Sequence, residues 1–243
     1  MAIRFDAAAD YLSRTANLPG YDPVTWCAWV YISTDTDAVA SLFVLTNGTG
    51  TTFDSLQLST DGTTLRILTQ NGSTSGTNLS TGTWYHLAYT RSGNTHLAYI
   101  NGVLDITRSD ANVVTVQAMG TGGNSAQTFN GLLHSIKIWD GVALSAAEIA
   151  QEMQTNHPQR FANLHIWSPT FDGTTERARD YSGNGYNWTE NGTLADEAPP
   201  PISWGASPIV MPIVTTVAGG IIGGVFQSHV IHKKAVETVV VGR

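Results

Sequence analysis

The 243-residue chain has few charged side chains, few lysines and a single cysteine. Charged residues make up 13% of it, against the ~25% usual for soluble domains, which argues against disorder and a helix-rich surface. With three lysines and a net charge of −7, the chain lacks the basic patch that phosphate backbones require, so we expect no nucleic-acid partner. The lone Cys27 excludes a disulfide scaffold and a thiolate metal cluster. Residues 1–10 hold no apolar segment of the kind that forms the h-region of a secretory signal peptide, so we expect no such peptide.

Short β-prone runs separated by turn residues dominate the chain. Asp61-Gly62 and Asn101-Gly102 tolerate the positive φ that tight hairpin turns need. Many antiparallel strands joined by frequent turns are typical of a β-sandwich or jelly roll, so we expect an all-β fold of two antiparallel sheets. The strands predicted in this way are Thr25–Ile32, Ala38–Leu45, Phe53–Ser59, Thr64–Gln70, Trp84–Arg91, His96–Ile100, Val103–Thr107 and Leu164–Phe171.

One short helix interrupts the strands. Ser145 can cap its N-terminus and Glu148 completes a capping box, while Leu144 and Ile149 form a hydrophobic staple. The helix should run over about residues 146–155, because a proline follows shortly afterwards. We expect it to cover one end of the sandwich.

A change of composition near residue 199 marks the clearest boundary in the chain. Residues 198–231 contain no Asp, Glu, Lys or Arg, and a proline-rich linker opens this stretch. The predicted organisation is a jelly-roll domain over residues 1–198, with a core at 3–155 and a wrapping extension at 156–198, followed by a Pro/Gly-rich apolar arm over 199–243.

The apolar arm needs a functional explanation. Residues 208–226 carry no charge, and their length and the lysines that follow them would suit a membrane span. Their prolines, glycines and β-branched residues favour an extended chain over a helix, however. We expect the arm to dock on copies of the same chain or on a capsid or tail protein, with a membrane as the less favoured partner. The predicted docking residues are Pro208, Ile209, Val210, Ile213, Val214, Ile221, Ile222 and Phe226.

Three motifs follow one another in the first 155 residues. Residues 25–30 read TWCAWV, residues 82–88 read GTWYHLA ahead of an Asn-Gly turn, and residues 136–149 read IKIWDGVALSAAEI. Together they resemble the laminin-G-like branch of the concanavalin A-like lectin/glucanase superfamily. The resemblance implies a jelly-roll sandwich, with carbohydrate binding as a common use.

Carbohydrate binding needs an exposed aromatic platform with polar side chains nearby. Tyr85, Trp139 and Trp188 are the candidates, although aromatic residues on strands more often belong to the core. Surface glycans are the ligands that the resemblance suggests.

A calcium site is a second implication of the resemblance. Asp180 and Asn184 lie in a Gly-rich loop similar to the family's ion-binding loop, with Asp172 behind them. The structural alternative is that both residues form Asx turns beside glycines and bind no ion. No cofactor is required, and calcium is the one ion suggested.

Glycoside hydrolysis would need two carboxylates flanking the scissile bond. None of the six glutamates lies in a predicted core strand, so we expect no catalytic residue and no enzyme activity. The preferred hypothesis is a non-enzymatic structural or adhesion protein of a virion surface, such as a phage capsid decoration, head-fibre or tail-associated protein. The alternative is a membrane-anchored bacterial surface lectin, and a glycoside hydrolase is less favoured.

Overall fold

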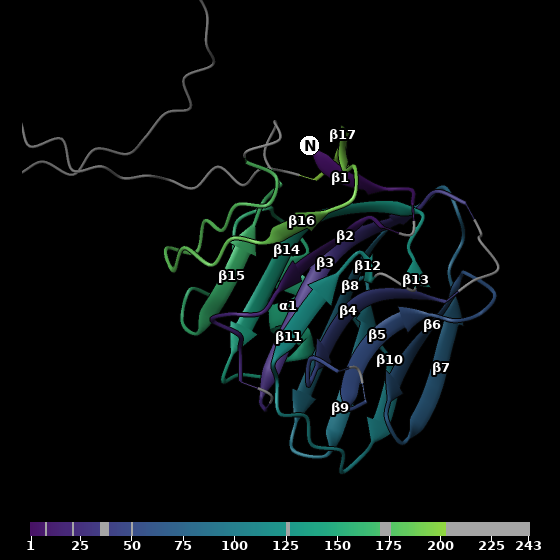
Figure 1. Cartoon of the computed structure of the whole chain (residues 1–243), viewed down its shortest axis with the longest axis vertical. Helices are drawn as coiled ribbons and strands as arrows, with labels where there is room; N and C mark the ends of the chain where they lie inside the picture. The colour runs from purple at the N-terminus through teal and green to yellow at the C-terminus, as the bar shows by residue number, and fades with distance from the viewer. Residues whose placement is uncertain are drawn as a thin grey trace, which may run out of the picture. The chain divides into compact units, whose positions relative to one another are not determined.

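Two antiparallel β-sheets face each other in the computed structural model, which describes residues 1–202 apart from residues 8, 21, 35–38, 50, 125–126 and 171–175 (Figure 1). The predicted all-β jelly-roll sandwich is confirmed. The eight-stranded sheet runs in the order β10 (Val103–Ser109), β9 (Thr95–Ile100), β8 (Trp84–Ser92), β3 (Val24–Ile32), β14 (Gly131–Asp140), β1 (Ala2–Phe5) and β17 (Ala195–Glu197), and β15 (Leu164–Ser168) also pairs with β14. The seven-stranded sheet runs β16 (Thr189–Asn191), β2 (Tyr11–Arg14), β11 (Ala118–Thr121), β4 (Ala40–Thr46), β5 (Phe53–Leu58), β6 (Thr64–Thr69) and β7 (Gly72–Asn78). A separate pair is formed by β12 (Gly123–Asn124) and β13 (Gln127–Thr128).

The predicted hairpins are present. Strands β9 and β10 pair across Asn101 and Gly102, whose φ angles of 51° and 80° are both positive, as a type I′ turn requires. Strands β5 and β6 pair across the Asp61-Gly62 loop. Local turn chemistry therefore determines the β9–β10 turn, whereas the longer β5–β6 loop has a positive φ at Gly62 (73°) but not at Asp61.

The main core lies between the two sheets. Apolar residues at alternate positions of the central strands point into it, and Trp26 of β3 stacks on Phe43 of β4 with ring centroids 5.6 Å apart. A second apolar cluster includes Cys27, Trp139, Leu144 and Ile149. Because Cys27 is the neighbour of Trp26 on β3, this second cluster lies on the outer face of the eight-stranded sheet.

Helix α1 (Ala146–Glu152) covers that outer face, so the prediction that it covers one end of the sandwich is wrong. The predicted capping box is present: the Ser145 hydroxyl accepts from the Glu148 backbone N–H, and the Glu148 carboxylate accepts from the Ser145 backbone N–H. The staple partners Leu144 and Ile149 are both buried against the sheet. The helix cap depends on residues close in sequence and could be predicted from them. The face of the sheet on which the helix packs depends on tertiary contacts and could not.

The helix ends at Glu152, three residues before the predicted end, where a buried lysine binds the last carbonyl of the helix. The Lys137 ammonium, on β14, donates to the backbone carbonyls of Glu152 and Thr155 at 3.0 and 3.1 Å. It also pairs with the Glu152 carboxylate at 2.9 Å, and both side chains are 1% exposed. The other Glu152 oxygen accepts from the backbone N–H groups of Gln159 and Arg160, each at 2.8 Å. This ion pair anchors the end of the helix and the following loop to the sheet.

Strand β14 contains a β-bulge at Ser135, whose φ is +54°. His134 pairs with Trp29 and Lys137 with Cys27, so three steps on β14 match two on β3. The outer neighbour of β14 also changes here, from β1, which pairs up to Leu133, to β15, which pairs from Ile136. The bulge is therefore the junction at which the late strands join the eight-stranded sheet.

Candidate functional site

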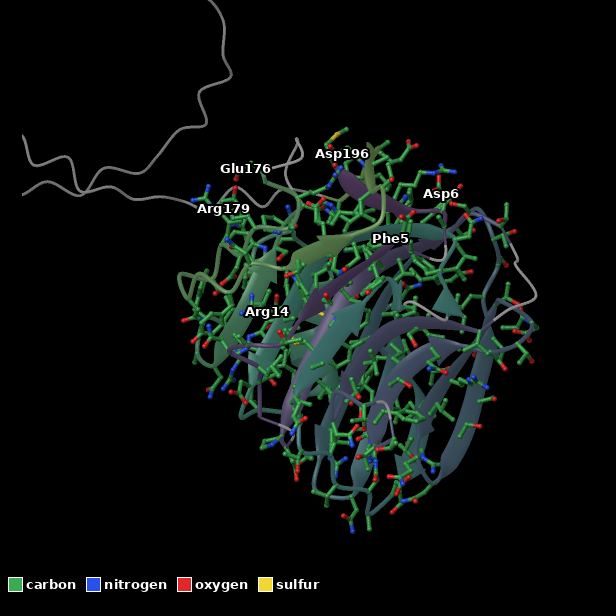
Figure 2. All side chains as sticks on the ribbon, in the orientation of Figure 1. Phe5, Asp6, Arg14, Glu176, Arg179 and Asp196 are labelled. Carbon is green, nitrogen blue, oxygen red and sulfur yellow. The ribbon has the colours of Figure 1, made fainter. Side chains whose placement is uncertain are left out.

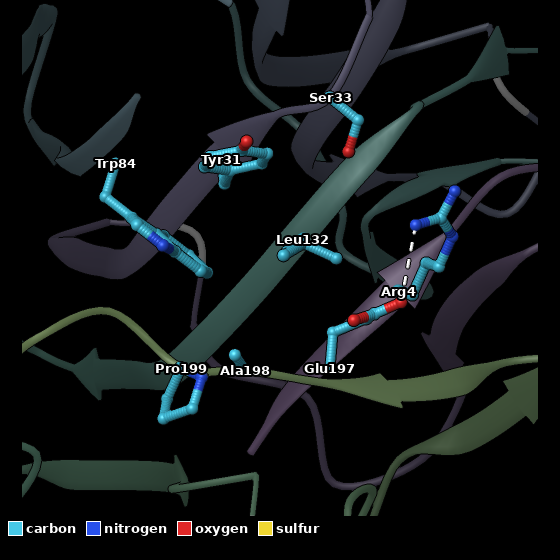
Figure 3. A pocket seen from close by; sticks show the side chains of 8 residues that line it. All are labelled: Arg4, Tyr31, Ser33, Trp84, Leu132, Glu197, Ala198 and Pro199. Atoms are coloured by element: carbon cyan, nitrogen blue, oxygen red, sulfur yellow. Dashed lines mark hydrogen bonds and ion pairs between the residues drawn. The ribbon is translucent and has the colours of Figure 1, made fainter. Parts of the chain in front are cut away.

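An open groove of about 390 Å³ crosses the outer face of the eight-stranded sheet, beside the region that α1 covers (Figure 3). Its volume lies in the range of small-ligand sites. The groove is lined by Arg4, Tyr31, Ser33, Trp84, Leu132, Glu197, Ala198 and Pro199.

Strand alternation and register place these side chains in one row. Arg4 pairs with Leu132, Leu132 with Tyr31, and Tyr31 with Trp84, on the successive strands β1, β14, β3 and β8. Their chain neighbours, such as Ile3 and Leu133, point into the core between the sheets. Because side chains alternate along a strand, the four paired residues face outward together.

Two aromatic rings form one end of the groove. The ring centroids of Tyr31 and Trp84 lie 5.4 Å apart at 50° to each other, and both residues are half-buried. Within the described residues, no hydrogen bond engages the Tyr31 hydroxyl or the Trp84 indole N–H. Leu132, between the aromatic pair and Arg4, gives the groove an apolar floor. An apolar face bordered by free polar atoms suits a ligand with both C–H and hydroxyl surfaces.

An ion-paired arginine forms the other end. Arg4 Nη1 lies 3.4 Å from Glu197 Oε1, the pair drawn with a dashed line in Figure 3. Arg4 Nε donates to Asp6 Oδ2 at 3.0 Å, and Asp6 lies at the end of the sandwich that carries β1 and β17 (Figure 1 and Figure 2). The Arg4 and Glu197 side chains are 36% and 44% exposed, so their remaining hydrogen-bonding atoms are open to a ligand.

A glycine fixes the strand beneath the groove. A Cβ on Gly131 of β14 would lie 2.1 Å from the Tyr31 carbonyl oxygen and 2.4 Å from the Phe129 ring. Any larger residue would push β3 away from β14 and displace Tyr31. The position requires glycine because of this close backbone approach.

The predicted carbohydrate residues are not in the groove. Trp139 is fully buried under α1, and its indole N–H donates to the Arg160 carbonyl at 2.9 Å. Trp188 is 5% exposed and donates to the Ser168 hydroxyl at 3.1 Å. Buried rings cannot form a surface platform, so the prediction is wrong for both tryptophans.

Tyr85 is one residue away from the groove, but it faces the opposite side of β8. It packs against the core between the sheets, and its hydroxyl accepts from the Ser80 backbone N–H at 3.0 Å. Its neighbour Trp84 faces the groove instead. Alternation along β8 separates Trp84 from Tyr85, but the register that pairs Trp84 with Tyr31 is set by the packing of β8 against β3 and is not visible in the sequence.

The predicted calcium residues organise a loop. The Asp180 carboxylate accepts from the backbone N–H groups of Trp167, Ser182 and Tyr186 at 2.8–3.0 Å, and from the Ser182 hydroxyl at 2.8 Å. The Asn184 amide donates to the Leu164 and His165 carbonyls, each at 3.0 Å. These bonds fasten the loop to β15. Nearby, Arg179 and Glu176 form a surface ion pair (Figure 2).

Calcium binding stays a prediction. Asp172 lies outside the described residues. In the described part of the chain, no three His, Cys, Asp or Glu side chains come together in a way that could hold a metal ion. The bond from the Ser182 backbone N–H to Asp180 matches the Asx-turn alternative, whereas the Asn184 amide donates to β15 and, among the described residues, forms no such turn.

The predicted arm, including its eight docking residues, lies outside the described residues from residue 203 onward. Among residues 1–202 as described, no helix has the length and apolar character needed to cross a bilayer.

A buried polar network joins the two sheets away from the groove. Arg91 of β8 pairs with Asp54 of β5 at 2.6 Å, and the Tyr89 hydroxyl lies 2.8 Å from His96 Nδ1. Burial raises the pKa of Asp54 to about 7 and lowers the pKa of His96 to about 4. All four side chains are closed to solvent, so the network is structural.

Comparison with known proteins agrees with this architecture. A family model described as the concanavalin A-like lectin/glucanases superfamily matches residues 6–150. No curated protein is similar enough to count as a match.

Three solved structures share the fold. A candidate carbohydrate-binding protein from Bacteroides ovatus has a TM-score of 0.60 and 18% identity, over 84% of this chain and 61% of its own length. A heptameric SAP-like pentraxin from Limulus polyphemus has a TM-score of 0.55 and 15% identity, over 80% and 93%. Domain 4 of a GH43 extracellular arabinanase from Geobacillus stearothermophilus, in complex with arabinotriose, has a TM-score of 0.52 and 20% identity, over 62% and 75%.

Proposed function

Because the chain belongs to the concanavalin A-like lectin/glucanase superfamily, we propose that it is a non-catalytic carbohydrate-binding protein whose ligand lies in the groove on the outer face of the eight-stranded sheet. One observation carries the proposal: the row Arg4, Leu132, Tyr31 and Trp84 places an aromatic pair and an ion-paired arginine on one exposed face. Sugars offer apolar C–H faces and hydroxyl groups, and this row offers partners for both.

Binding without catalysis is supported by the acids around the groove. Glycoside hydrolysis requires two carboxylates on either side of the bond. Glu197 is the one carboxylate among the eight lining residues, and it is paired with Arg4. We therefore expect binding without turnover.

The test is an array of neutral and acidic oligosaccharides probed with the full chain and with Trp84→Ala. Truncation of a central aromatic contact should weaken binding by about tenfold or more. Phe161→Ala is the matched control, because Phe161 is 65% exposed and does not line the groove. Equal binding by the wild type and Trp84→Ala, or no binding to any glycan, would refute the proposal.

A virion surface is the location that we propose for this binding protein, with a bacterial cell surface as the alternative. Its support is the composition of residues 198–231, which lack Asp, Glu, Lys and Arg. Light scattering of the full chain without detergent should give a discrete oligomer, and Ile213→Asp/Val214→Asp should reduce its mass. A full chain that stays in solution only with detergent would favour a membrane anchor instead.

A further inference from the structure

The charges around the groove leave a net negative charge beside its lining cation. Arg4 is the one cation among the lining residues, and it contacts two carboxylates, Asp6 at 3.0 Å and Glu197 at 3.4 Å. The guanidinium and its two partners carry a formal charge of −1 together. An anionic ligand would meet this negative charge with no uncommitted lining cation to compensate it.

The row of residues also has a definite length. Arg4 and Trp84 lie on strands that are three steps apart in the sheet, with β14 and β3 between them. At ~4.8 Å per step, the two ends are separated by about 14 Å, which exceeds the width of one sugar ring.

Free hydrogen-bonding atoms lie along the row. Within the described residues, the Ser33 and Tyr31 hydroxyls and the Trp84 indole N–H have no hydrogen-bond partner. Arg4 Nη2 and the second Glu197 oxygen are also uncommitted there. The set contains both donors and acceptors, which is what a ligand rich in hydroxyl groups needs.

Resting on the proposed function, we infer that the ligand is an uncharged oligosaccharide of about three pyranose units that lies across the strands. One ring packs on Tyr31 and Trp84. The unit at the far end exchanges hydrogen bonds with Arg4 and Glu197 through its hydroxyl groups.

The charge of the ligand is tested with matched probes. Neutral glucose and galactose trisaccharides are titrated calorimetrically against the full chain, beside the same trisaccharides oxidised at C6 to uronates. Whichever neutral trisaccharide binds should have a Kd at least about tenfold lower than that of its oxidised counterpart. Glu197→Gln keeps the side-chain shape, removes one negative charge and should narrow that difference. Equal or tighter binding of the oxidised form would overturn the inference.

The orientation of the ligand is tested by its length. A monosaccharide on the aromatic pair cannot reach Arg4, so Trp84→Ala should weaken it and Glu197→Gln should leave it unchanged. The trisaccharide should respond to both substitutions, while Phe161→Ala should change neither affinity. A trisaccharide that is indifferent to Glu197→Gln would overturn the cross-strand placement.

Failure of the inference and failure of the proposed function give different results. If an acidic glycan binds and Trp84→Ala abolishes its binding, the groove is the site and only the ligand class is wrong. If no saccharide binds, the proposed function is wrong and the inference fails with it.

Discussion

Replacing Glu152 by glutamine should lower the free energy of unfolding by about 3–5 kcal/mol, because it leaves the Lys137 ammonium buried without a counter-charge. Both side chains are 1% exposed, and Nζ and Oε2 are 2.9 Å apart. Glutamine can still accept from the backbone N–H groups of Gln159 and Arg160, but its amide N–H₂ would then face the ammonium. Helix α1 has seven residues, and a helix this short depends on its tertiary contacts, of which this ion pair is one.

A double-mutant cycle separates the ion pair from the packing. Lys137→Met should also cost about 3 kcal/mol or more, because it leaves the Glu152 carboxylate buried without its counter-ion. The double variant Lys137→Met/Glu152→Gln removes both charges, so its cost should fall at least about 2 kcal/mol below the sum of the single costs.

Urea unfolding at pH 7, followed by tryptophan fluorescence, measures all three variants. Glu148→Gln is the control on the same helix: Glu148 pairs with Arg160 at the surface, with both side chains about one-third exposed, and its loss should cost about 1 kcal/mol or less. A cost below about 1 kcal/mol for Glu152→Gln, or strict additivity in the cycle, would refute the reasoning.

Three further predictions concern buried or strained positions. Cys27 is 1% exposed and burial raises its pKa to about 12, so iodoacetamide at pH 8 should label it only in denaturant; rapid labelling of the native protein would contradict this. Burial lowers the pKa of His86 from 6.5 to about 3. Between these two pH values His86 is protonated in the unfolded chain but neutral in the folded protein. The free energy of unfolding therefore decreases as pH falls: from about pH 6 to 4 the wild type should lose about 1.4 kcal/mol per pH unit relative to His86→Gln. Parallel curves of unfolding free energy against pH for the two proteins would refute this prediction. Gly102→Ala should cost more than Gly93→Ala in thermal unfolding, because both have positive φ but only the Gly102 Cβ would meet Ala150, at 3.0 Å; equal losses would show that contact with the helix is unimportant.

Local chemistry made part of this structure predictable. The Asn101-Gly102 turn and the Ser145 cap depend on neighbours within four residues, and both are confirmed. The burial of Trp139 depends on a helix that packs over it from outside the sheet. Sequence periodicity cannot show which face a later segment covers.

The groove was missed for a related reason. Arg4 and Glu197 are separated by 193 positions and meet because β17 pairs with β1. The carbohydrate residues predicted from the sequence include Tyr85 but not Trp84, and a difference of one residue selects the opposite face of a strand. The residue types that line the groove can be read from the sequence, whereas the strand order that brings them together cannot.

The bulge at Ser135 makes the length of β14 a constraint on the whole molecule. Leu132 and Lys137 are five positions apart, an odd number, and on a regular strand they would face opposite sides. The extra residue restores even parity, so the strand presents the groove floor and the helix anchor on the same side. Deleting one residue between them would point the side chain of either Lys137 or Leu132 toward the core between the sheets. Natural insertions and deletions should therefore collect in the loops and spare this strand.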